Sequence, residues 1–435
     1  MALSVGAAIV IVITRYRHSS VPSAEPSYLK VLDDTAIVFS TDHTRSWISR
    51  VSSAGIVLWW RPVDGTPTSG DPIRILGDIV AVRSQSGKAR LMTAFKVTGD
   101  PLWQRQLALQ DTAHDRSGPA YGVVGVNRLL EEVRSGTETR LQSIDPPTGV
   151  VGWTVPWGWY RTASVIGPRL IAYGLETPRG KALDGLDLRT GDSVSKSVRG
   201  VGCVIGQDYI AVSSTSLVRF TGGDLQSPST IRENFDLRGT VSACGSYRDR
   251  IVMLVDDERM SRVVVVDQAG KELSIVELPR HLEFDQYELA LRHGDLVPFG
   301  GELPRFVPFV QQSAEGGVTM VDLEAGAIAW QGKTHALDHA TVFRDRGRWY
   351  LNTEQYLAMF DGSTGRLAAA IALLDGEPVG PEHVSDGVIW LIRQRVTMPV
   401  DEPPVTTIDS RTLAGIHGRR VFDVLPTIRE LLGSP

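Results

Sequence analysis

The feature that most constrains the fold of this chain is a short unit that recurs along almost its whole length. Each complete unit has an apolar strand, a turn that contains glycine, and a second strand with a tryptophan four residues after that glycine. Four copies keep this pattern, and their tryptophans are Trp59, Trp103, Trp153 and Trp330. Self-similarity at a long period indicates supersecondary units that bury their apolar faces against one another.

Weaker copies lack the tryptophan but keep the strand and the turn. They begin at Leu186, Phe220, Val266, Phe360 and Ile408. The glycines of successive copies lie 32 to 56 residues apart, and a period of roughly 40 to 50 residues with several short strands is the size of one propeller blade. A β-sandwich or a β-helix also alternates short strands, but neither explains this long period with a fixed offset from glycine to tryptophan. The sequence therefore predicts an all-β protein, a β-propeller of four-stranded antiparallel blades.

The turn of the unit is best preserved as Asp145-Pro-Pro-Thr148-Gly149. An aspartate side chain can hydrogen-bond to the backbone of such a turn, and glycine takes a positive φ without steric cost. We therefore expect the aspartate and the glycine to shape the turn, and the tryptophan to pack between adjacent blades.

Composition agrees with this fold and excludes one class of partner. The chain has 435 residues, and its 43 glycines and 24 prolines are spread along it, as expected for many short strands joined by tight turns. The formal net charge is −5, with acidic and basic residues interleaved. No basic patch typical of nucleic-acid binding is visible, so we expect no nucleic-acid partner.

The N-terminal residues suggest attachment to a membrane. Residues 2–13 form an uncharged apolar run, and an arginine pair and a Ser/Pro-rich stretch follow. As a helix, twelve residues span about 18 Å, less than the roughly 20 residues needed to cross a bilayer. Residues 1–18 are therefore interpreted as a hydrophobic membrane anchor or as a signal segment, and residues 19–27 as a linker. The arginines by themselves favour a cytoplasmic body, so the orientation stays open.

The unit Asp-x-x-Thr-Gly-x-x-x-Trp, complete at residues 145–153, resembles the tryptophan-docking repeat of the pyrroloquinoline quinone (PQQ)-like β-propeller family. That family includes quinoprotein dehydrogenases and the outer-membrane-protein assembly lipoprotein. The resemblance covers residues 28–424 and leaves 425–435 as a C-terminal tail. It implies eight blades, whereas nine candidate units are counted. Either one weak copy is spurious, or the N- and C-terminal strands share a ring-closing blade, so seven to nine blades are possible.

The resemblance does not extend to a cofactor site. The family's enzymes hold their quinone beside a calcium ion with acidic and amide side chains, often under two adjacent cysteines, whereas Cys203 and Cys244 are far apart in the sequence. The pair His335 and His339 has a helical ligand spacing in a strand-rich context, and residues 256–258 fit a hairpin tip. We therefore expect no catalytic residue, no metal ligand and no cofactor.

Two further groups of residues stand out. Cys203 and Cys244 align 41 positions apart, at sites that the alignment makes equivalent in neighbouring units. If both lie on innermost strands they can form a disulfide; otherwise they are two separate buried small hydrophobes. Trp157, Trp159 and Tyr160 are candidates for a partner-facing aromatic patch, with packing between blades as the alternative. The Pro-rich segment 398–404 is predicted to be a protruding loop.

These observations and the resemblance together favour a non-enzymatic protein–protein interaction scaffold in a membrane-associated or cell-envelope assembly. The fold analogy places the propeller outside the cytoplasmic membrane, in a periplasm or at a cell surface. A ligand- or glycan-binding sensor domain is the first alternative, and a PQQ-dependent dehydrogenase is the second.

Overall fold

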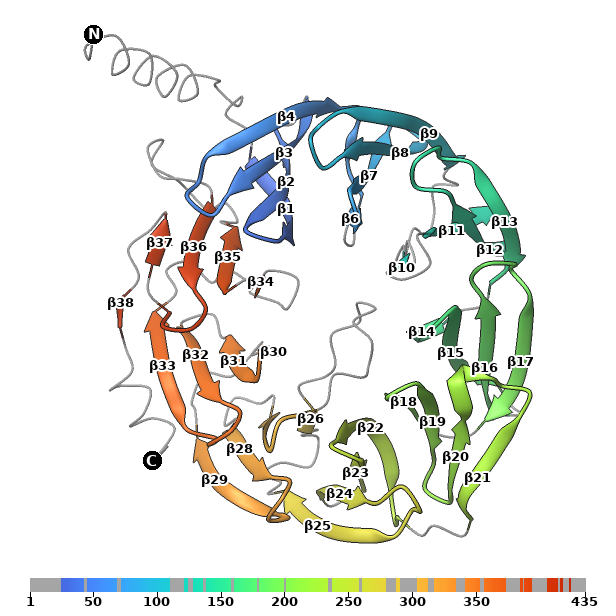
Figure 1. The fold of residues 1–435 in the computed structure, drawn as a ribbon, viewed down its shortest axis with the longest axis vertical. Helices are drawn as coiled ribbons and strands as arrows, with labels where there is room; N and C mark the ends of the chain where they lie inside the picture. Colours follow the sequence, from blue (N-terminus) through green and yellow to red (C-terminus); the bar gives the residue numbers. More distant parts are fainter. Residues whose placement is uncertain are drawn as a thin grey trace, which may run out of the picture.

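The computed structural model describes residues 25–42, 45–68, 72–109, 121–123, 128–135, 138–157, 160–177, 180–198, 201–233, 237–257, 260–278, 287–289, 303–311, 317–333, 341–352, 356–372, 384–385, 387–392, 405–413, 415–417 and 422–423. Their strands form antiparallel sheets arranged one after another around a ring (Figure 1). In each sheet the first strand lies toward the centre of the ring and the later strands toward the outside. This is a β-propeller, as the repeat predicts.

Blades are numbered here in chain order. Blade 1 contains β1 (Glu25–Leu32), β2 (Thr35–Thr41), β3 (Ser46–Ser52) and β4 (Val57–Val63). Blade 2 contains β5 (Thr66–Pro67), β6 (Ile73–Leu76), β7 (Ile79–Ser86), β8 (Ala89–Lys96) and β9 (Pro101–Leu109). Blade 3 contains β10 (Tyr121–Val123), β11 (Arg128–Ser135), β12 (Glu138–Ile144) and β13 (Val151–Pro156). Blade 4 contains β14 (Tyr160–Ile166), β15 (Arg169–Thr177), β16 (Gly180–Asp187) and β17 (Ser193–Val198). Blade 5 contains β18 (Val201–Ile205), β19 (Asp208–Val212), β20 (Ser216–Phe220), a 3₁₀ turn (Thr221–Gly223) and β21 (Pro228–Glu233). Blade 6 contains β22 (Thr240–Tyr247), β23 (Arg250–Asp256), β24 (Ser261–Val266) and β25 (Glu272–Leu278). Blade 7 contains β26 (Tyr287–Leu289), β27 (Phe306–Gln311), β28 (Gly317–Asp322) and β29 (Ala327–Lys333). Blade 8 contains β30 (Thr341–Asp345), β31 (Arg348–Asn352), β32 (Tyr356–Asp361), β33 (Leu367–Ala372) and, as a fifth strand, β38 (Phe422–Asp423). Blade 9 contains β34 (Val384–Ser385), β35 (Val388–Ile392), β36 (Val405–Asp409) and β37 (Gly415–His417).

The number of sheets corrects the family expectation of eight. Within the described residues the strands form nine sheets, and each contains one of the nine repeat units counted in the sequence. The weakly conserved copies that begin at Phe220 and Ile408 are therefore real blades. The first strand begins at Glu25, inside the segment that was interpreted as a linker.

The ring closes without a shared blade, contrary to one of the two explanations for the ninth unit. Blade 1 consists only of N-terminal strands, and blade 9 only of strands that follow residue 383. The two meet by packing: Trp390 of β35 is fully buried against Leu29, Ala36 and Val38. The Thr407 hydroxyl also donates a hydrogen bond of 2.7 Å to the carbonyl of Ser53. The ring is therefore closed by side-chain contacts between blades 9 and 1, and not by one sheet that contains both N- and C-terminal strands.

The tryptophans join neighbouring blades in the way that the repeat predicts. The indole N–H of Trp59 donates to the carbonyl of Val97 in blade 2, at 2.7 Å. The other three donate in the same way to the following blade: Trp103 to Pro146 at 2.6 Å, Trp153 to Leu188 at 3.2 Å, and Trp330 to Gly365 at 2.7 Å. Each tryptophan therefore satisfies a carbonyl of the neighbouring turn and buries its ring against that turn.

The turn itself is shaped by aspartate and by a positive φ. The Asp187 carboxylate accepts hydrogen bonds from the backbone N–H groups of Arg189 and Thr190, at 2.8 and 3.1 Å. Gly149 has a φ of 70°, and a Cβ there would lie 2.7 Å from the Trp103 ring, so only glycine permits this close approach. In blade 9 the same position is Leu413, which adopts a φ of 56° and whose N–H bonds to the Asp409 carbonyl at 2.8 Å. The turn geometry persists there although the glycine has been lost.

We expect the tryptophan junction to be worth a measurable part of the stability. The substitution Trp103→Phe keeps an aromatic ring but leaves the Pro146 carbonyl without its donor, and should lower the free energy of unfolding by about 1–2 kcal/mol. Trp103→Ala also removes the ring and should cost roughly 3 kcal/mol. Ser274→Ala, at the equivalent position in a blade that has no tryptophan, should change stability little. Urea unfolding of the three variants measures these differences, and equal midpoints for Trp103→Phe and the wild type would contradict the assigned role.

Because the aspartates of the turns have lowered pKa values, we expect the protein to lose stability in acid. A hydrogen bond from the Ser363 hydroxyl lowers the pKa of Asp361 against the opposing effect of burial, and backbone bonds from residues 363 and 364 lower it further. Burial alone would raise the pKa values of Asp187 and Asp409. Backbone hydrogen bonds to Asp187, and bonds from the Thr412 hydroxyl and the backbone to Asp409, lower both pKa values below their usual range. A lowered native pKa stabilises the fold above the unfolded value, about 3.9, and this contribution is lost as pH falls through the native pKa. Asp361→Asn keeps an acceptor without the charge, so it should cost about 1 kcal/mol at pH 7 and almost nothing near pH 2. Thermal unfolding from pH 2 to 7 tests this, and a cost that does not change with pH would refute it.

Candidate functional site

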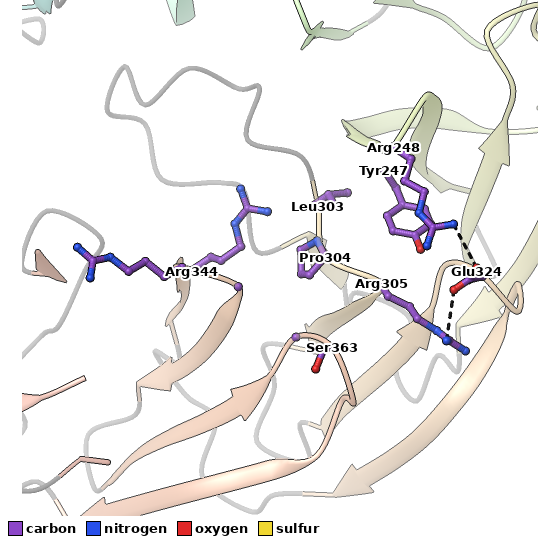
Figure 2. A pocket seen from close by; sticks show the side chains of 11 residues that line it. Tyr247, Arg248, Leu303, Pro304, Arg305, Glu324, Arg344 and Ser363 are labelled. Atoms are coloured by element: carbon purple, nitrogen blue, oxygen red, sulfur yellow. Dashed lines mark hydrogen bonds and ion pairs between the residues drawn. The ribbon is translucent and has the colours of Figure 1, made fainter. Parts of the chain in front are cut away.

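A pocket with a volume of about 680 Å³ opens on one face of the ring between blades 6, 7 and 8 (Figure 2). Its lining comes from the hairpin turns of blades 6 and 8, from the residues before β27 and from the β28–β29 turn. This is the face that carries the aspartate–glycine turns of the repeat. Five of the eleven lining residues are charged: Arg248, Arg305, Arg344, Arg346 and Glu324.

Two of these arginines occupy backbone positions that do not suit them. Arg248 and Arg346 each start the short connection between the first two strands of their blades, with φ values of 52° and 46°. Blades 2, 4 and 5 use Gly77, Gly167 and Gly206 at that position. A non-glycine residue in this conformation costs roughly 1–2 kcal/mol. Asp33 takes the same conformation at the corresponding position of blade 1, with a φ of 52°. The pocket is a candidate site because four arginines from three blades line it together.

A carboxylate already lies between two of the guanidinium groups. One Glu324 oxygen lies 3.1 Å from Arg248 and the other lies 3.2 Å from Arg305. Arg305 also donates two hydrogen bonds to the Asp322 carboxylate, of 2.9 and 2.6 Å. Burial alone would raise the pKa of Asp322, but these bonds and the backbone N–H groups of residues 324 and 325 lower it below its usual value. Asp322 therefore stays ionised and keeps Arg305 in place.

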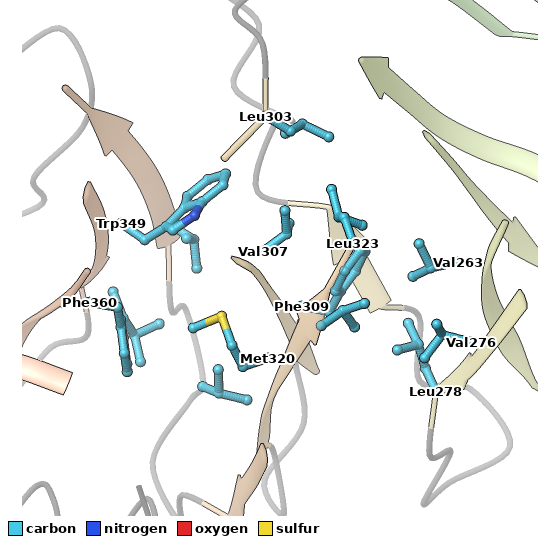
Figure 3. Packing of buried hydrophobic residues seen from close by; sticks show 14 of the residues in the cluster. Val263, Val276, Leu278, Leu303, Val307, Phe309, Met320, Leu323, Trp349 and Phe360 are labelled. Carbon is cyan, nitrogen blue, oxygen red and sulfur yellow. The ribbon is translucent and has the colours of Figure 1, made fainter. Parts of the chain in front are cut away.

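Aromatic rings and a rigid core support the pocket from below. The guanidinium carbon of Arg248 lies 5.1 Å from the centroid of the Tyr247 ring, and that of Arg305 lies 5.1 Å from the centroid of Phe306. Figure 3 shows the buried cluster of these blades, in which Leu303, a lining residue, packs with residues such as Val307 and Trp349. The Trp349 indole N–H donates 2.7 Å to the Phe306 carbonyl and so links blade 8 to blade 7. The arginines are therefore presented by a packed frame.

The lining is suited to binding anions. Guanidinium groups stay protonated at any physiological pH and offer several N–H donors but no acceptor, so they bind carboxylates or phosphates and do not act as a base. Hydrogen bonds between a guanidinium and an oxyanion are among the strong ones. Within the part of the chain that the structure describes, no group of three or more His, Cys, Asp or Glu side chains could hold a metal ion.

The two cysteines are joined in a disulfide, with their Cα atoms 5.6 Å apart. Both lie on first strands, β18 and β22, and both side chains are buried. The interpretation as two separate hydrophobes is therefore wrong, and so is the equivalence of the two sites. Cys203 lies three residues before the turn at Gly206, and Cys244 lies four residues before the turn at Arg248. A one-residue offset reverses the face of a strand, so the two thiols point toward each other between blades 5 and 6.

Of the three aromatic candidates, the structure describes the side chain of Trp157 alone. Trp157 is only 8% exposed and packs with Leu130 and Leu141 of blade 3 and with Leu170 and Leu186 of blade 4. For Trp157 this corrects the partner-facing interpretation in favour of packing between blades, because its ring fills the gap between two sheets. Trp159 lies outside the described residues. Tyr160 begins β14, and its side chain is not described.

Several other predicted features fall outside the described residues. They are the anchor or signal segment 1–18, residues 19–24 of the linker, His335 and His339, the loop 398–404 and the tail 425–435. Asp257 accepts the N–H of Met260 at 2.8 Å, as expected for a hairpin tip. Among the residues with described coordinates, no helix has the length and apolar character of a transmembrane span.

Sequence reasoning missed the arginine pocket. Its residues come from three units and lie between residues 247 and 363, and most of them belong to turns that were treated only as connections. One signal was present: Arg248 and Arg346 stand where blades 2, 4 and 5 have glycine. An alignment of the repeats by the hairpin turn between their first two strands exposes this exchange.

No protein-family model matches the chain, and no curated protein matches it. Solved structures with a similar fold include BamB from Moraxella catarrhalis, at 16% identity and a TM-score of 0.43, covering 76% of this chain and 94% of that one. A europium-containing methanol dehydrogenase is 10% identical with a TM-score of 0.44, covering 88% of this chain and 83% of that one. The dihydro-heme d1 dehydrogenase NirN, in complex with DHE, is 13% identical with a TM-score of 0.46, covering 84% and 78%. These likenesses concern the propeller fold.

We expect the disulfide to contribute strongly to stability. A bond that closes a 41-residue loop stabilises the native state by roughly 4 kcal/mol in the chain-entropy model. The double variant Cys203→Ala and Cys244→Ala should therefore unfold at a lower urea concentration than the oxidised wild type, and the reduced wild type should resemble the variant. Alkylation of the denatured protein should label both cysteines only after reduction. Two labelled thiols without reductant would show that the bond does not form in solution.

Proposed function

We propose that this chain is a non-enzymatic protein–protein interaction scaffold of a membrane-associated or cell-envelope assembly. The observation that carries the proposal is the arginine-lined pocket, which three consecutive blades build together on the face of the aspartate–glycine turns. Its side chains bind rather than react, and arginine and tyrosine are the residues enriched at the energetic centres of protein interfaces.

The tryptophan junctions support placing the chain among the PQQ-like propellers. Four indole N–H groups donate to the turn of the following blade, which is the feature that the repeat resembles. The lining of this pocket, with four arginines and one glutamate, lacks the several acidic and amide ligands that a quinone and calcium site needs.

The disulfide supports an extracytoplasmic location. Disulfides persist in oxidising compartments and are rare in reducing ones, and the bond between Cys203 and Cys244 lies buried between two blades as a structural element. We therefore propose that the propeller faces a periplasm or the cell exterior, attached through its N-terminal segment.

One observation favours a second function. A volume of about 680 Å³ falls within the roughly 300–1,000 Å³ of small-molecule sites. A sensor domain that binds an anionic ligand or glycan in the same pocket is therefore the alternative, and it requires no protein partner.

The test is affinity purification of the full chain from membranes of its host cell after mild cross-linking. We expect a protein to co-purify in stoichiometric amount, and to be reduced at least tenfold by the double variant Arg248→Glu and Arg346→Glu. Arg189→Glu, which changes an exposed arginine on an aspartate–glycine turn of blade 4, should leave it unchanged. If no protein depends on these arginines while glycan binding does, the sensor function is correct and the scaffold is not.

A further inference from the structure

We propose that Arg248 and Arg305 form a binding site for the carboxylates of an acidic peptide segment, and that Glu324 occupies this site as an internal competitor. The inference deepens the proposed function, on which it rests, because it names the chemistry of the partner. It starts from the carboxylate that the site already binds, which is one of the protein's own.

The geometry of Glu324 is that of a bridging ligand. Each of its two oxygens pairs with a different guanidinium, at 3.1 Å for Arg248 and 3.2 Å for Arg305. The two arginines come from different blades, and Figure 2 shows Glu324 between them. A carboxylate on another chain would find the same two donors if Glu324 moved aside.

Arg305 is held independently of Glu324. Asp322 fixes Arg305 through two hydrogen bonds, and the Nη1 group that contacts Glu324 is not used in them. The Arg248 guanidinium carbon lies 5.1 Å from the centroid of the Tyr247 ring. Neutralising Glu324 therefore leaves the Arg305 donor in position, and binding of a new carboxylate requires rearrangement mainly of Arg248.

The bridge is weak enough to be displaced. The side chains of Arg248, Arg305 and Glu324 are 55%, 43% and 39% exposed. Ion pairs at such exposure contribute little because water and salt screen them. An incoming acidic segment that brings several carboxylates can therefore compete with a single internal one.

The shape of the pocket favours an extended peptide over a single small anion. Arg344 lies on the other side of Pro304 from the group formed by Arg248, Glu324 and Arg305 (Figure 2). Arg346 also lines the pocket. Cationic groups spread across three blades match a chain with several separated carboxylates.

Binding of a fluorescent hexaglutamate peptide to the full chain tests the proposal. We expect saturable binding that weakens as salt rises. Glu324→Gln should tighten it roughly threefold to tenfold, because it removes the competitor from two exposed pairs. Arg248→Gln should weaken binding at least fivefold. Glu272→Gln on the outer strand of blade 6 and Arg189→Gln on blade 4 are matched charge controls and should have no effect.

Three results would overturn the proposal. They are equal binding of hexaglutamine, an unchanged or weaker affinity in Glu324→Gln with unchanged thermal stability, and binding of citrate as tight as that of the peptide, which would make the ligand a free carboxylate. The proposed function fails separately. If a partner protein binds through Arg346 and hexaglutamate does not displace it, the scaffold function stands and this inference is rejected. If the peptide binds but no partner protein is found, this inference stands and the scaffold function is rejected.

Discussion

The structure depends on the contact between one blade and the turn of the next. A propeller sheet cannot bury both of its faces alone, so each blade must supply a surface that the following blade fits. Here an indole N–H bonds to a carbonyl that the turn exposes, and its ring lies against a glycine with no side chain. The aspartate holds the turn in the conformation that makes both contacts possible. Tryptophan, aspartate and glycine therefore recur together because each supports the same junction.

Because tryptophan, aspartate and glycine recur together at each such junction, the sequence could predict the fold. The spacing from Gly149 to Trp153 is visible in one dimension, and it implied the strands, the turns and the contact between blades before any coordinates. The number of blades was less secure, since the family suggested eight and the weak copy at Phe220 could have been spurious. The copy at Ile408 has leucine in place of glycine, yet Leu413 takes the left-handed conformation that the turn requires. The hydrogen bonds of Asp409 to residues 411 and 412 thus accompany the same turn geometry where the glycine is absent.

The candidate site could not be predicted in the same way. Its residues share no spacing, because they come from the turns of three units and meet only when the ring has closed. The disulfide shows the same difficulty on a smaller scale. Matching Cys203 with Cys244 identified the right pair of strands, but made the two sites equivalent, and equivalent residues of neighbouring blades face the same way around the ring. The single-residue offset that turns Cys244 back toward blade 5 becomes visible only with the strand pairing.

The site and the disulfide both lie beside junctions that lack the tryptophan. Between blades 5 and 6 the tryptophan position is Arg232, which bonds to the Gly270 carbonyl, and between blades 6 and 7 it is Ser274, which packs on Gly326. Neither residue reproduces an indole, and other contacts are found there: the disulfide between blades 5 and 6, and the ion pairs of Arg248 and Arg305 with Glu324 at blades 6 and 7. A junction that no longer relies on tryptophan needs another source of stability. At blades 6 and 7 that source is the buried cluster that both blades share, in which Val263 and Val276 of blade 6 pack with residues such as Phe309 of blade 7. The exposed ion pairs contribute little to stability, so their charges are available to a ligand of the opposite sign.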